Sequence, residues 1–128
     1  MTEMDNSNNS ADSKRMEDLN NLPIMDPTTF KALPASLQGR MLEMFKDLVP
    51  KSLELISGHL EADDLNAFSE ESHKLKGYAL QLGLTRLSAL SNTLQNESAT
   101  MPREELDTLV ARLSKIFDES VEAIKSCL

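Results

Sequence analysis

The C-terminal segment repeats its inward-facing residues at intervals of three and four, and this spacing constrains the fold more than any other feature. The repeat is formed by Leu106, Leu109, Leu113, Ile116, Ser120 and Ile124. Such a spacing places one stripe along an α-helix. Similar stripes run over residues 36–60, 65–82 and 85–97, and no stretch alternates as a strand would. The sequence therefore predicts an all-α protein.

Punctuating residues separate these segments. Asp26 followed by Pro27 is typical of a helix start, and Pro34 ends the short helix that it predicts over residues 27–33. Pro50 lies inside the segment 36–60, where it predicts one kinked helix, with two helices meeting at the proline as the alternative.

The later segments have their own end signals. Asp63 or Asp64 can cap the helix predicted from residue 65, and Gly83 follows that helix in a position where a left-handed residue is common. Pro102 opens the last helix. Four amphipathic helices with short connections predict an antiparallel four-helix bundle with a short extra N-terminal helix.

Composition divides the chain into two parts. Residues 1–21 are polar and acidic, with too few apolar side chains to offset the entropy of ordering, so we expect a disordered tail there. Residues 22–128 are expected to form one bundle domain.

The formal net charge of −8 disfavours nucleic acid and anionic membranes as partners, because both require clustered Lys and Arg. His59, His73 and Cys127 do not form a set of metal ligands, so no metal is expected. The sequence has no secretory signal pattern and no apolar run of about 20 residues, the length needed to span a bilayer. We expect a cytoplasmic monomer.

His73 is the candidate functional residue, because its position on the predicted helix points it to solvent. At about 100° per residue, Phe68, Leu75, Ala79 and Leu82 fall about 180–240° away from it. A core histidine is thereby excluded, although an ordinary surface histidine is not.

The neighbours of His73 favour a function. Gly77 lies one turn on, at a cost of about 1 kcal/mol relative to Ala in a helix interior, and it clears the space beside the ring. Lys76 can reach a group carried on the ring, Lys74 lies on the flank, and Leu80 is an exposed apolar residue on the same face. A neutral imidazole is a nucleophile near pH 7, and a phosphoryl group on it would be stabilised by Lys76.

The stretch "HKLKGYALQLG" resembles the signature of histidine-containing phosphotransfer (HPt) domains, which is roughly His-x-Leu-Lys-Gly, a stretch of small residues and a second Gly, followed by a Leu-rich helix. Its elements here are His73, Leu75, Lys76, Gly77, Gly83, Leu87, Leu90 and Leu94. The similarity extends to the layout of residues 36–128.

The resemblance implies that His73 accepts a phosphoryl group from a receiver-domain aspartyl-phosphate and passes it to another receiver domain. It implies that Lys76 neutralises the phosphoryl group and that Gly77 lets the receiver approach. The expected protein is a phosphoryl carrier and not an ATP-dependent kinase, because the sequence has no P-loop and no Gly-rich kinase lid. It needs no cofactor, since Mg²⁺ would be supplied by the receiver.

Further receiver contacts are expected around His73. Leu80 and Leu84 would form an apolar rim, Lys74 and Arg86 would orient the partner, and Gln95 stands where the family often carries Glu or Gln. Its alternative is an ordinary solvent-facing residue.

One substitution departs from the family pattern. Tyr78 replaces the usual Ser or Ala and is expected to pack sideways, away from His73. The competing functional hypothesis is a helical adaptor that binds a signalling partner through an apolar groove without transferring phosphate.

Overall fold

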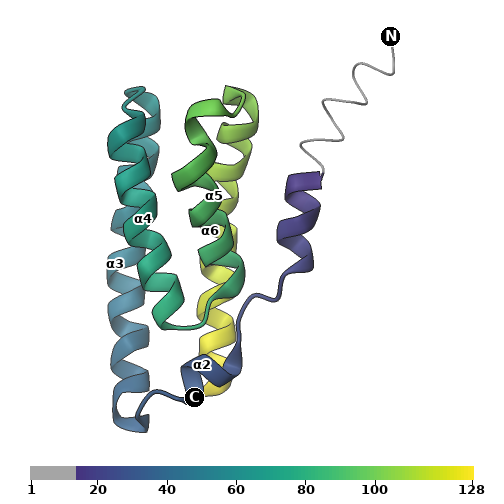
Figure 1. Ribbon diagram of the computed structural model, residues 1–128. Coiled ribbons are helices and arrows are strands. Elements are labelled where there is room, and N and C mark those ends of the chain that lie inside the picture. The colour runs from purple at the N-terminus through teal and green to yellow at the C-terminus, as the bar shows by residue number, and fades with distance from the viewer. Residues whose placement is uncertain (1–13) are drawn as a thin grey trace.

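Four long helices form the body of the protein in this computed structural model, which describes residues 14–128 (Figure 1). They are α3 (Ala35–Glu61), α4 (Leu65–Gln81), α5 (Thr85–Glu97) and α6 (Arg103–Cys127). Neighbouring helices run antiparallel, and each packs on two others: α3 on α4 and α6, and α5 on α4 and α6. The predicted all-α fold, an antiparallel four-helix bundle, is confirmed.

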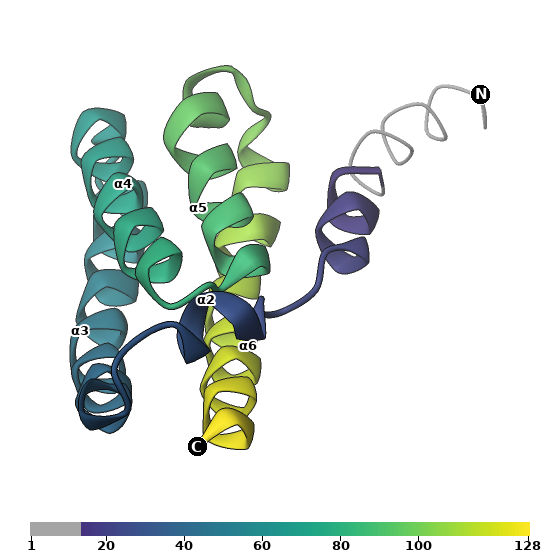
Figure 2. The same cartoon turned by 60° about the horizontal axis from the view of Figure 1, so that its bottom comes forward.

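The short helix α2 (Pro27–Lys31) lies across one end of the bundle, where α3 and α6 extend beyond α4 and α5 (Figure 2). Asp26 caps it as predicted, accepting a hydrogen bond from the Thr28 amide at 3.0 Å, with Pro27 at the first helical position. Phe30 is fully buried and fixes α2 to the end of the core.

Helix α3 continues through Pro50 without interruption, so the alternative of two helices is wrong. At mid-height it is tied to α4 by a buried polar contact. The Ser52 hydroxyl donates to the Glu71 carboxylate at 2.7 Å, and both residues are buried. This bond satisfies polar groups that would be costly to bury unpaired.

The two ends of α4 follow the sequence signals. Asp64 caps the first turn by accepting from the Ala67 amide at 3.1 Å. Gly83 has a φ of 73°, the left-handed conformation expected after the helix. It also lies against the α2 segment, because its carbonyl accepts from the Asp26 amide at 2.7 Å.

The prediction of a disordered tail over residues 1–21 is wrong for residues 14–21, which are helical; residues 1–13 lie outside the described part of the chain. Arg15 forms ion pairs with Glu97 on α5 and with the buried Glu105 on α6. Leu19 is buried as well. The segment is therefore held on the α5–α6 face by contacts between residues far apart in the sequence.

The core fills the space between the helices and is almost entirely aliphatic. Its fully buried large side chains are Phe30, Phe68, Ile56, Leu75, Leu82, Leu84, Leu87, Leu90, Leu94, Leu109, Leu113 and Ile124. In residues 14–128 no helix combines the length and apolarity needed to cross a membrane.

Candidate functional site: the outer face of α4

His73 lies midway along α4 with its side chain exposed, on the opposite side of the helix from the buried Phe68, Leu75 and Ala79. The predicted orientation is confirmed. The ring lines an open hollow between α4 and α5, formed by Asn66, Ser69, Glu70, His73, Lys74 and Gln95. A small group carried on the ring would therefore lie in solvent, within reach of side chains from two helices.

Gly77 leaves the space one turn above His73 empty. A Cβ placed on it would meet no atom within 4 Å, so no packing contact inside the described chain requires a glycine there. Glycine nevertheless destabilises a helix interior by about 1 kcal/mol relative to alanine. The prediction that Gly77 gives clearance to a partner therefore stays a prediction, and no contact within residues 14–128 offers another reason for this glycine.

The two lysines of the stretch take different directions. The Lys76 ammonium lies 3.4 Å from the Asn92 side-chain oxygen on α5, a weak contact that a phosphoryl group could displace. Lys74 points to the other flank, 3.9 Å from the Glu71 carboxylate. The side chain of Lys76 thus extends toward α5, whereas the side chain of Lys74 lines the His73 hollow.

Gln95 comes from the last turns of α5 and lines the same hollow. Its side-chain oxygen is buried and has no hydrogen-bond partner within residues 14–128. Its backbone carbonyl accepts from the Ser69 hydroxyl at 2.8 Å, which ties this end of α5 to α4. The structure therefore brings Gln95 to the His73 hollow, as the sequence predicts.

Two of the expected receiver contacts are not placed as predicted. Leu84 is fully buried, so the prediction that it lines an apolar rim is wrong. Arg86 is half-buried and donates to the backbone carbonyls of Leu22 and Asn20, so it holds the N-terminal segment rather than facing the hollow. Leu80, by contrast, is exposed to 57% on the His73 side of α4.

Tyr78 packs sideways as expected. It is half-buried and lies against α3, in a small hollow shared with Met41, Met44, Phe45 and Leu48. It leaves the His73 ring uncovered.

Asn92 was missed by the sequence analysis, although a signal for it exists. It precedes Gln95 by three residues on α5, so both side chains lie on the face of α5 that meets α4. A search of the predicted fourth helix for polar residues at that spacing would have found it.

Comparison with known proteins identifies the family. The sequence model described as "Hpt domain" matches residues 40–126, most of the bundle. The chain belongs to the Hpt domain family. Hpt domains, as a family, are histidine phosphotransfer domains of phosphorelays that interact with receiver domains.

The curated relatives are larger proteins. The chain is 25% identical over 85 residues to the aerobic respiration control sensor protein ArcB of Escherichia coli K12 and, equally, to that of Shigella flexneri. The match covers 66% of this chain and 11% of each relative. The chain thus corresponds to a small part of those sensor proteins.

Solved structures agree on the fold. The histidine-containing phosphotransfer domain of E. coli ArcB is similar with a TM-score of 0.68 and 22% identity, over 77% of this chain and 84% of that domain. A solution structure of the same domain gives a TM-score of 0.72 and 21% identity, over 87% and 92%. The Hpt bundle is therefore preserved although few residues are identical.

Proposed function

We propose that His73 is the phosphoryl carrier of this Hpt domain. It accepts the group from the aspartyl-phosphate of one receiver domain and passes it to the aspartate of a second. An unprotonated ring nitrogen attacks phosphorus, the N–P bond forms as the acyl O–P bond breaks, and the electron pair leaves on the aspartate carboxylate. The observation that supports this most strongly is the exposed ring beside the empty space at Gly77.

Three residues assist the transfer in this proposal. Lys76 leaves its 3.4 Å contact with Asn92 and neutralises charge on the phosphoryl oxygens. The side chain of Gln95, whose oxygen has no partner within residues 14–128, turns in the hollow so that its NH₂ group donates to the ring or to the phosphoryl group. Gly77 admits the receiver surface, which brings its own Mg²⁺ and aspartate to His73.

The working unit is the bundle of residues 22–128, with residues 14–21 packed on it. Leu80 and Lys74 border the approach to His73 and are proposed receiver contacts. In this proposal the donor is a phosphorylated receiver, and the domain acts as a carrier rather than as an ATP-dependent kinase.

Transfer from a phosphorylated receiver tests this directly. Receivers labelled with radioactive acetyl phosphate are mixed with the chain, and acid-labile, alkali-stable label is counted over time. His73→Gln is expected to remove all labelling, whereas the matched variant His59→Gln, at the other histidine, keeps it. ATP alone is expected to give no label.

Lys76→Met sharpens the assignment of the cation. It is expected to slow transfer about tenfold without loss of helical circular dichroism, while Lys74→Met slows it less. An unchanged rate in Lys76→Met would remove its role. A wild-type chain that binds receivers but accepts label from none of them would favour the adaptor hypothesis.

A further inference from the structure

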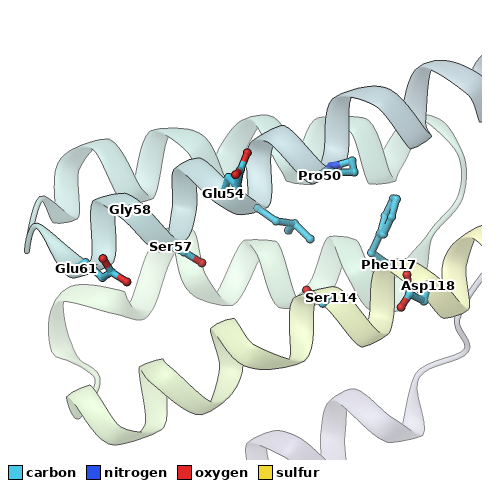
Figure 3. A pocket seen from close by; sticks show the side chains of 9 residues that line it. Pro50, Glu54, Ser57, Gly58, Glu61, Ser114, Phe117 and Asp118 are labelled. Carbon is cyan, nitrogen blue, oxygen red and sulfur yellow. The ribbon is translucent and has the colours of Figure 1, made fainter.

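A second hollow lies between α3 and α6, away from His73 (Figure 3). This hollow, the α3–α6 groove, is open to solvent and has a volume of about 610 Å³. Its lining residues are Pro50, Leu53, Glu54, Ser57, Gly58, Glu61, Ser114, Phe117 and Asp118. None of them lines the His73 hollow. The two hollows therefore share no lining residue.

The groove has an apolar floor. Pro50, Leu53 and Phe117 supply it, with the Pro50 and Phe117 rings near one end in Figure 3. Phe117 is only half-buried, and its ring is supported from below by Phe45, with the two centroids 5.2 Å apart. A partly exposed aromatic ring held in place by the core is a preformed contact for an apolar side chain.

The rim of the groove carries one sign of charge. Glu54, Glu61 and Asp118 are exposed, and the nine lining residues include no Lys or Arg. Within residues 14–128 none of these three carboxylates forms an ion pair. Lys46 lines an adjoining hollow with Phe117 and Asp118, and its ammonium lies 3.9 Å from the Glu43 carboxylate.

Gly58 opens the groove in the way that Gly77 opens the His73 face. It is exposed inside α3, and a Cβ placed on it would meet nothing within 4 Å. The described chain gains nothing from this glycine, which costs helix stability. A partner that lies close to the α3 backbone would account for it.

We propose that the α3–α6 groove docks a basic amphipathic helix of a partner protein. From Pro50 to Glu61 the groove runs for about 16 Å, or about three turns of a helix. Its walls are helices, so an extended peptide would find no strand edge to join, whereas a helix satisfies its own backbone. Apolar residues on one face of that helix would cover Phe117, and flanking Lys or Arg would meet the three carboxylates.

Such docking gives the domain a second point of attachment. A partner held in the groove stays near His73 without covering it, which raises the effective concentration of any receiver that it carries. This consequence rests on the proposed function of His73, but docking itself does not, and the experiment below measures docking alone.

The experiment uses a fluorescein-labelled 14-residue peptide with Leu at three-four spacing and Lys elsewhere, followed by anisotropy at about 0.15 M salt. Binding is expected, and it should fall at least tenfold for a scrambled peptide of the same composition and for a peptide with Glu in place of Lys. Equal binding of the scrambled peptide would overturn the proposal.

Charge-matched variants locate the site. Glu54→Lys with Asp118→Lys is expected to weaken binding at least tenfold. The control pair Glu17→Lys with Glu104→Lys changes the net charge by the same amount, at exposed positions elsewhere in residues 14–128 that form no ion pair there. It should change the affinity for the peptide less than twofold. Equal losses would reduce the effect to general attraction to an acidic protein and contradict the proposal.

A glycine pair gives a second test that does not depend on charge. Gly58→Gln fills the groove with a helix-favouring side chain and should weaken binding at least fivefold. Gly39→Gln places the same side chain at another exposed, open glycine of α3 and should not. Unchanged binding in Gly58→Gln would overturn the docking geometry. A wild-type dimer in sedimentation that Gly58→Gln dissociates would make a second copy the occupant and overturn the basic-helix proposal.

Discussion

Gly77 and Gly83 belong to the same sequence signature, yet they lie in opposite environments. A Cβ at Gly77 would meet nothing within 4 Å, whereas one at Gly83 would lie 2.7 Å from both the Asp26 carbonyl oxygen and the Thr29 Cβ. Gly83 is required by the fold itself, because its own φ is positive and because the α2 segment packs against it. Gly77 has no internal requirement, and this contrast directs attention to a partner at the His73 face.

The contrast extends to polar side chains on the covered and the open sides of the bundle. On the covered side, Arg86 holds the carbonyls of Asn20 and Leu22, and Arg15 pairs with Glu97 and Glu105. On the open side, Lys76 makes only a 3.4 Å contact and the Gln95 side-chain oxygen has no partner within residues 14–128. The Lys76 ammonium and the Gln95 side-chain oxygen therefore remain available where we expect a receiver. Buried polar atoms without a partner are not confined to that face, because Arg112 Nε and Ser72 Oγ also have none within residues 14–128.

The largest effect is expected from Gly83→Ala. The left-handed backbone and the close contacts with Asp26 and Thr29 should together lower the free energy of unfolding by about 2 to 5 kcal/mol. Urea denaturation followed by circular dichroism measures this. A loss below about 0.5 kcal/mol, within the range of neutral surface changes, would show that α2 does not pack on the turn as described.

A smaller loss is expected from Arg15→Met on the covered side. Burial alone would lower the pKa of the Arg15 guanidinium, but hydrogen bonds and charge attraction from Glu105 and Glu97 raise it above its ordinary value, so Arg15 stays charged. Removing it leaves the buried Glu105 without its partner, at a cost of about 1 to 2 kcal/mol after allowance for solvent screening.

A double-mutant cycle checks that cost in the same denaturation assay. Glu105→Gln removes the buried charge, so the added loss from Arg15→Met should shrink in its background. Equal losses in both backgrounds would show that Arg15 does not act through Glu105.

The smallest effect, and the only gain, is expected from Gly77→Ala. With open space around the Cβ, helix propensity alone should raise the free energy of unfolding by up to about 1 kcal/mol. The same urea assay applies, and the opposite sign to Gly83→Ala is the informative result. Destabilisation would mean that Gly77 has a packing role and that the contrast is false.

Local patterns were enough to predict the bundle, the Asp26 cap, a cap at Asp63 or Asp64, the left-handed Gly83 and the outward direction of His73. They fail where a contact joins distant parts of the chain. Arg15 and Glu105 are 90 positions apart in the sequence, so nothing near either residue signals that a polar N-terminal segment will be held on α5 and α6.

The errors at Leu84 and Arg86 also arise where helix periodicity gives no guidance. Leu84 lies in the connection between the two predicted helices, at the N-cap of α5, and is fully buried there. Arg86 would face solvent if residues 20–22 were disordered, but those residues supply its acceptors. The prediction for Arg86 thus depended on an N-terminal segment that the sequence was expected to leave free.

The central claim is that His73 is open to a receiver because Gly77 leaves room for one. It is tested most directly by phosphorylating Gly77→Gln in parallel with two donors: phosphoramidate, which is small enough to reach any exposed imidazole, and a phosphorylated receiver. The account predicts wild-type labelling of His73 by phosphoramidate and at least a tenfold slower transfer from the receiver. Unchanged transfer from the receiver, or an equal loss with both donors, would contradict it.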